Sequence, residues 1–200
     1  MRRLRPALLA AVVALGLAAC ADAPTMPGTA AASSATSAPL ASTLTTAETE
    51  LTALLRAVPL ASSVTYSATV SASKGGKFDV PGTGLTVTVP AYAFKARSMT
   101  ITVTALAGDV VAYEFGPHGT KFDKPLELAQ SYKGTSYESL LDKSGVEAGY
   151  FDDAGDVNKE EKTVKVSEIL SVTHDGTTGK LRFDVHHFSG YMLSSGRGVK

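Results

Sequence analysis

Three consecutive residues near the end of the chain could do chemistry together: His187, Phe188 and Ser189. The hydroxyl of Ser189 could attack the carbonyl of Phe188 and convert that peptide bond into an ester, which water would hydrolyse. His187 would serve as the general base, because imidazole has a pKa close to neutral. In an extended strand, residues 187 and 189 point to the same face, so the pairing is allowed. One interpretation of the motif is therefore autoproteolysis between Phe188 and Ser189.

The same motif also has a structural interpretation. The segment from Leu181 to Val185 alternates apolar with polar residues, and His187 continues the apolar positions as a hydrogen-bonded core histidine. Ser189 would then begin a turn with Gly190. Self-cleavage needs backbone strain and oxyanion donors, and a strand pattern predicts neither. The sequence favours the structural role and leaves cleavage as the alternative.

A second group of chemistry-bearing side chains lies between residues 152 and 160. Carboxylate and amide oxygens are the ligands that Ca²⁺ prefers. Their order does not place a glycine and a final glutamate at the offsets of an EF-hand loop. The pattern favours a solvated hairpin loop, and a calcium-dependent adhesion module is the alternative. The residues are Asp152, Asp153, Asp156, Asn158 and Glu160.

Composition and missing motifs exclude several other classes of function. The 200 residues carry 19 Lys+Arg and 19 Asp+Glu, so attraction to nucleic acid is not expected. A single cysteine excludes an intramolecular disulfide framework and a cysteine-rich zinc site. The sequence has no phosphate loop, dinucleotide fingerprint or G-x-S-x-G elbow. We therefore expect no cofactor, no bound metal and no enzyme activity except the intramolecular cleavage described above.

The N-terminus has the pattern of an export signal. Arg2, Arg3 and Arg5 precede an apolar run over residues 7–19, which is too short to span a bilayer as a helix. The run ends at Cys20, the only cysteine, and the sequence LAAC resembles the lipobox of bacterial lipoproteins. That resemblance implies a signal peptide over 1–19, acylation of Cys20 and attachment to a lipid bilayer in the cell envelope. Ala21, in place of aspartate, favours the outer membrane in an organism that has one.

Residues 20–43 follow as a tether rich in Ala, Ser, Thr, Pro and Gly, which cannot bury a core. Loss of three signal arginines leaves 16 basic and 19 acidic residues, a net charge of −3. Thr45 and Glu48 have the spacing of a capping box, and apolar residues then recur at helical intervals up to Pro59. We expect a short helix within residues 44–60.

From Val64 onward the hydrophobic period is two, which indicates strands with one face on a core. The alternation is clearest over residues 85–89, 99–105 and 181–185, and turn residues separate the segments. Eight or nine short strands of this kind predict an all-β fold, an antiparallel β-sandwich over residues 61–195 with one short N-terminal helix and a tail over 196–200.

An ordered series of motifs resembles the ZU-five domain of zona-occludens proteins, netrin receptors and ankyrins. The series comprises Gly75-Gly76, Leu85 to Pro90, Ile101-Thr102-Val103, Glu114 to Gly119, and Phe122 with Lys124 to Leu128. The chain departs from the family at Ala91-Tyr92-Ala93, where the family often has Gly-Ala. The resemblance implies a β-sandwich that serves as an adaptor, scaffold or regulatory module. It also implies that His187-Phe188-Ser189 corresponds to a motif at which some relatives cut themselves.

Together these features predict an envelope lipoprotein whose β-sandwich is a protein-interaction or structural module. Its partners would be the bilayer, through Cys20, and an unidentified protein or glycan, with no nucleic acid. Self-processing at Phe188-Ser189 and calcium-dependent adhesion are the two alternatives.

Overall fold

The structure is a computed structural model that describes residues 49–197. The predicted signal peptide, Cys20 and the tether lie outside the described residues, as do residues 198–200. The chain divides into two units, Met1–Thr43 and Leu44–Lys200, and the following description concerns the second.

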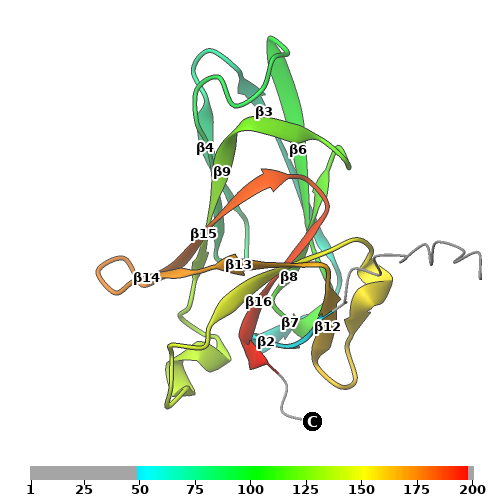
Figure 1. Cartoon of the computed structure of the whole chain (residues 1–200), viewed down its shortest axis with the longest axis vertical. Coiled ribbons are helices and arrows are strands. Elements are labelled where there is room, and N and C mark those ends of the chain that lie inside the picture. The colour runs from blue at the N-terminus through cyan, green and yellow to red at the C-terminus, as the bar shows by residue number, and fades with distance from the viewer. Residues whose placement is uncertain (1–48, 198–200) are drawn as a thin grey trace, which may run out of the picture. The chain divides into compact units, whose positions relative to one another are not determined.

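Two antiparallel sheets form a β-sandwich (Figure 1). The larger sheet has the strand order β11-β12-β1-β16-β8-β6-β3, and β10 and β13 join it beside β16. Its strands are β11 (Val157–Asn158), β12 (Thr163–Val166), β1 (Thr49–Ala53), β16 (Gly190–Arg197), β8 (Ala112–Gly116), β6 (Ser98–Ala105), β3 (Val64–Ser71), β10 (Glu147–Phe151) and β13 (Glu168–Ser171).

The smaller sheet has the order β14-β15-β9-β5-β4, and a separate two-stranded pair joins β2 to β7. Two short 3₁₀ turns lie in the connections. These elements are β14 (Thr173–Asp175), β15 (Lys180–His187), β9 (Lys121–Ser131), β5 (Leu85–Val89), β4 (Gly76–Val80), β2 (Leu55–Leu60), β7 (Gly108–Val110), η1 (Ser136–Ser139) and η2 (Ala154–Asp156). The predicted all-β class and antiparallel sandwich are confirmed.

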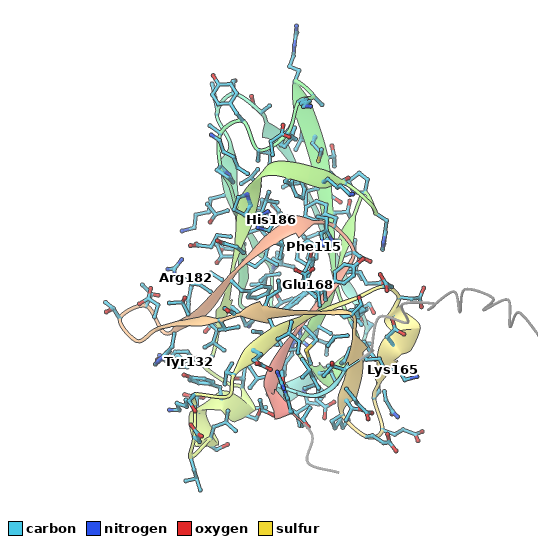
Figure 2. The ribbon with its side chains drawn as sticks, viewed as in Figure 1. Phe115, Tyr132, Lys165, Glu168, Arg182 and His186 are labelled. Carbon is cyan, nitrogen blue, oxygen red and sulfur yellow. The ribbon has the colours of Figure 1, made fainter. Side chains whose placement is uncertain are left out.

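The period-two pattern explains the core. Leu85, Val87 and Val89 are buried, as are the apolar residues that alternate along β15 and those that follow Met99 along β6. On the outward face of β3 and β6, hydroxyl side chains pair instead, with Oγ1 of Thr65 lying 3.0 Å from Oγ1 of Thr104. Because successive side chains alternate between faces, strands such as β15 bury every second residue in the core. Side chains around Phe115 fill the space between the sheets (Figure 2).

The helix expected within residues 44–60 is wrong over the described part, because residues 49–53 and 55–60 are strands β1 and β2. Leu51 is paired with Val164 on one side and Arg197 on the other, so β1 is an internal strand. Val58, on the expected apolar helix face, is 79% exposed. Pairing with distant strands therefore outweighs the local helical spacing.

The sandwich therefore begins earlier and ends later in the sequence than predicted. Its first strand begins at Thr49, not after residue 60, and its last strand continues to Arg197. Residues 44–48 of the expected helix lie outside the described residues. Over residues 49–197, no helix has the length and apolar character needed to cross a membrane.

Candidate functional site

The His187-Phe188-Ser189 motif lies at the corner where the chain passes from one sheet to the other. His187 is the last residue of β15 in the smaller sheet, and Gly190 begins β16 in the larger sheet. Figure 1 shows this passage between the orange β15 and the red β16. Phe188 and Ser189 thus form a two-residue connection between the layers.

Backbone hydrogen bonds hold this connection against β8 and the segment that follows it. The amide of Phe188 donates to the carbonyl of Thr120 at 2.9 Å, and the amide of Gly119 donates to the carbonyl of Phe188 at 3.0 Å. The carbonyl of Ser189 accepts from the amide of Phe115 at 2.7 Å. A corner with three such bonds is fixed, and the Gly119 amide is one donor pointing at the carbonyl that cleavage would attack.

Phe188 is an anchor of the main core, with 1% of its surface exposed. Its ring stacks on Phe115 at a centroid distance of 5.4 Å and meets Phe122 edge-on at 4.6 Å. Aromatic pairs in these geometries stabilise a core beyond the area they bury. The middle residue of the motif therefore has a structural function.

His187 faces polar and aromatic neighbours on the larger sheet. Its Nε2 lies 3.3 Å from a carboxylate oxygen of Glu168, and its Nδ1 lies 3.3 Å from the hydroxyl of Tyr191. The ring also meets Tyr150 edge-on at 4.6 Å. A register shift between Val185 and His187 interrupts the strict alternation of β15, so His187 is half-buried. Both ring nitrogens have partners other than Ser189.

Ser189 is almost buried, and its Oγ donates to the backbone carbonyl of Asp152 at 3.0 Å. In the described part of the chain, no hydrogen bond joins this Oγ to the His187 ring. The hydroxyl has Tyr150 as a neighbour. Burial raises the pKa of Tyr150, the Asp152 carboxylate raises it further, and the Ser189 hydroxyl lowers it. A phenol with a raised pKa is protonated at neutral pH, so it cannot act as the missing base.

The corner opens to solvent through a shallow cavity of about 420 Å³. His118 and Gly119, from the Gly-Pro-His-Gly turn, line it together with Tyr150 and His187. The structure thus brings the predicted motif together with a turn about 70 residues earlier in the sequence. Water can reach this corner, but the described geometry lacks an aligned nucleophile and base.

Three of the five polar side chains singled out between residues 152 and 160 cap nearby backbone groups. Asp153 accepts from the amide of Gly155 at 2.8 Å, and Asp156 accepts from the amide of Asp153 at 3.1 Å, which forms a capping box around η2. Asn158 accepts from the amides of Glu160 and Glu161. Within the described chain, no group of three or more His, Cys, Asp or Glu side chains is arranged to hold a metal ion.

Sequence patterns found the motif but missed its partners. Glu168, Tyr191 and the carbonyl of Asp152 contact it through the arrangement of β10, β13 and β16. Residue spacing along the chain carries no sign of these contacts. The predicted lipidation residue, Cys20, lies outside the described residues.

Replacing Ser189 by alanine is expected to lower the free energy of unfolding by about 1 kcal/mol, because one hydrogen bond to the Asp152 carbonyl is lost. Urea unfolding followed by fluorescence or circular dichroism measures this loss. Ser139→Ala is the control, since its hydroxyl is exposed and bonds only within its own turn. Equal stabilities of Ser189→Ala and the parent protein would contradict a structural role for this hydroxyl.

The fold and the corner together define an all-β antiparallel sandwich with a hydrogen-bonded His-Phe-Ser connection between its layers. A scan of the chain against models of protein families finds no match, and a search of curated proteins finds no match either. The ZU-five resemblance and the lipoprotein interpretation therefore stay predictions from the sequence.

Proposed function

We propose that this protein is a lipid-anchored lipoprotein of the bacterial cell envelope whose ZU-five-like β-sandwich is an interaction or structural module. The anchor would be acylated Cys20, with the outer membrane favoured in an organism that has one, and residues 21–43 would hold the domain off the bilayer. The partner would be a protein or a glycan of the envelope.

We favour a binding or structural module over an enzyme because of the contacts that the His-Phe-Ser corner makes. Its nucleophile donates to a backbone carbonyl and has no hydrogen bond to the His187 ring among the described residues, and its phenylalanine is packed in the core. Groups used in this way support the fold. These contacts therefore favour a structural role for the His-Phe-Ser residues in a binding domain.

Self-processing between Phe188 and Ser189 is the second candidate, and one contact favours it. The amide of Gly119 already donates to the Phe188 carbonyl, as an oxyanion donor would. Cleavage would also require Ser189 to leave the Asp152 carbonyl and His187 to turn toward it. The balance of contacts therefore favours the uncut module.

Replacing Cys20 by serine tests the anchor. The parent protein is expected to incorporate a clickable fatty acid and to sediment with membranes, and Cys20→Ser is expected to lose the label and leave the membrane fraction. Several acyl chains hold a protein firmly at a bilayer, so the loss should be nearly complete. Ser37→Ala, within the tether, is the matched control and should keep both properties. Equal labelling of the parent and Cys20→Ser would contradict the proposal.

A further inference from the structure

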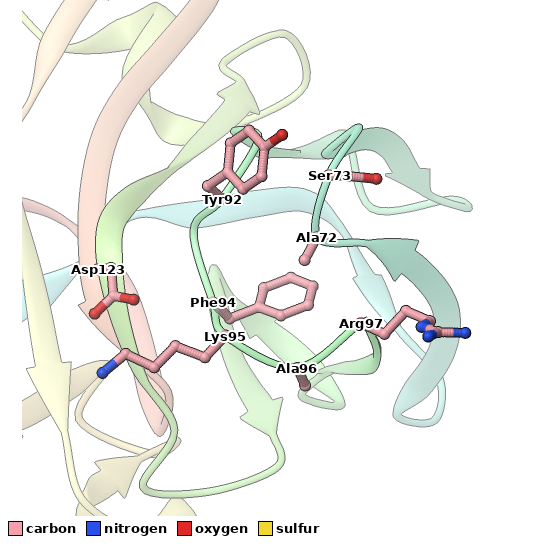
Figure 3. Close-up of a pocket in the computed structure, with 8 residues that line it drawn as sticks. All are labelled: Ala72, Ser73, Tyr92, Phe94, Lys95, Ala96, Arg97 and Asp123. Atoms are coloured by element: carbon pink, nitrogen blue, oxygen red, sulfur yellow. The ribbon is translucent and has the colours of Figure 1, made fainter.

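A second cavity, of about 420 Å³, lies at the end of the sandwich where β3 turns into β4 (Figure 3). The loop between β5 and β6 supplies most of its wall, and Asp123 on β9 and the turn after β3 complete it. Its lining is mixed, with a phenol, a phenyl ring, two cations, one carboxylate and one aliphatic hydroxyl. These side chains are Tyr92, Phe94, Lys95, Arg97, Asp123 and Ser73.

Hydrogen bonds on both sides hold the loop that carries this cavity. On one side, the amide of Tyr92 donates to the carbonyl of Ala72 at 2.7 Å, and the amide of Ala72 donates to the carbonyl of Arg97 at 3.0 Å. On the other side, the amide of Asp123 donates to the carbonyl of Ala93 at 2.8 Å. A wall fixed in this way costs little ordering entropy when a ligand binds.

Tyr92 is the most unusual residue of the loop. Its backbone lies in the left-handed region at φ +61°, which glycine adopts without strain and tyrosine does not. The side chain is 63% exposed, so core packing does not explain the choice of tyrosine. The Lys124 ammonium lies 5.7 Å from the ring centroid and bonds the carbonyl of Ala91, which holds it beside the ring. A strained residue that presents an aromatic face to solvent indicates a binding function.

Positive charge gathers around this end of the domain, although the mature chain is predicted to be net acidic. The carboxylate that lines the cavity is that of Asp123, and Asp79 on β4 accepts a hydrogen bond from Thr86. Within residues 49–197, neither Lys95 nor Arg97 forms an ion pair. The exposed cations of this end are Lys74, Lys77, Lys95, Arg97 and Lys124.

We propose that this cavity binds an acidic saccharide, a sugar that carries a carboxylate. The apolar C–H face of a pyranose ring stacks on an exposed aromatic ring such as Tyr92. Asp123 and Ser73 lie on opposite sides of Phe94 (Figure 3), so they can bond the hydroxyls of different sugar units of an oligosaccharide. The guanidinium of Arg97 can take the carboxylate in a paired hydrogen bond. Phe94, with 6% of its surface exposed, forms the floor of the cavity. This inference rests on the proposed function as a binding module and names its site and ligand class.

Calorimetric titration of the mature chain, kept in solution by Cys20→Ser, tests the proposal. A short oligogalacturonate is the probe, chitotriose is the neutral oligosaccharide for comparison, and phosphatidylglycerol vesicles are the anionic surface without sugar. We expect saturable binding of oligogalacturonate, at least about tenfold tighter than that of chitotriose and weakened by salt. Absence of saturable binding, or binding to the vesicles alone, would overturn the inference.

Two variants and a charge-matched control locate the site. Tyr92→Gly removes the ring and relieves the left-handed strain, so we expect an unchanged or higher melting temperature with at least about tenfold weaker binding. Arg97→Gln should remove most of the preference for the acidic sugar. Lys165→Gln deletes the same charge on β12, away from this end (Figure 2), and should bind as the parent does.

Unchanged affinity in Tyr92→Gly would overturn the assignment to this cavity. The anchor experiment with Cys20→Ser reads a different property, so its failure and the failure of sugar binding are distinguishable.

Discussion

Replacing Gly190 by alanine is expected to lower the free energy of unfolding by about 3 kcal/mol, the upper end of the usual cost of overpacking a core. Gly190 is paired with Phe151 on β10 and with Glu114 on β8, so the backbone has little freedom to move. A Cβ added at this position would overlap the ring of Phe151. That ring is fully buried in a cluster with Leu51 and Met192, and it cannot turn away without disturbing these neighbours.

Urea unfolding of Gly190→Ala against the parent protein measures the loss. Gly145→Ala is the matched control, because its added methyl group meets nothing within 4 Å. The double variant Gly190→Ala with Phe151→Leu should be more stable than the sum of the two single losses implies, since the smaller side chain makes room. Additive losses would contradict the overlap as the cause.

Replacing Phe188 by alanine is expected to cost about 3–5 kcal/mol, the usual loss for a buried phenylalanine. The ring is 1% exposed and contacts both Phe115 and Phe122. Its removal would leave a cavity at the corner between the sheets, where the backbone is held by hydrogen bonds and cannot collapse inward. A domain stabilised by 5–15 kcal/mol would lose a large share of its stability.

The same denaturation series measures Phe188→Ala, with Phe188→Leu as the milder replacement. Leu141→Ala controls for the loss of an apolar side chain, because Leu141 is fully exposed and should cost less than about 0.5 kcal/mol. A loss for Phe188→Ala no larger than that for Leu141→Ala would contradict the role of Phe188 as a core anchor.

Alternation of apolar and polar residues was sufficient to predict the sandwich. Leu85, Val87 and Val89 are all buried, as a strand with one face on a core requires. The signal is strong because the period of a strand is a local property of the backbone. Each predicted strand from Val64 onward shows this period of two, whichever strand it pairs with.

Local signals failed where pairing decides the structure. The spacing of Leu51, Leu54 and Leu55 suits a helix, yet β1 lies between β12 and β16 in the larger sheet. Two partners separated from β1 by more than 100 residues supply its hydrogen bonds and bury Leu51. A window of a dozen residues contains no information on those partners.

At the candidate site, too, the sequence shows the residue types but not their long-range contacts. The chemical types in His187 and Ser189 are visible in the sequence, but their use depends on distant residues. The imidazole of His187 contacts Glu168 and Tyr191, and the hydroxyl of Ser189 donates to the carbonyl of Asp152. The register shift before His187 also breaks the alternation from which its direction was inferred. Tyr92 was visible only as a departure from the ZU-five pattern, and its left-handed backbone appears in the structure alone.

The most direct test of an architectural corner is the intact mass of the mature chain, carrying Cys20→Ser, after purification and denaturation. Mass is required because cleavage before Ser189 would release only residues 189–200, a difference that gels can miss. We predict one species of full length, identical in processing to Ser189→Ala. A chain ending at Phe188, restored to full length by Ser189→Ala, would contradict the account and identify the protein as a self-processing domain.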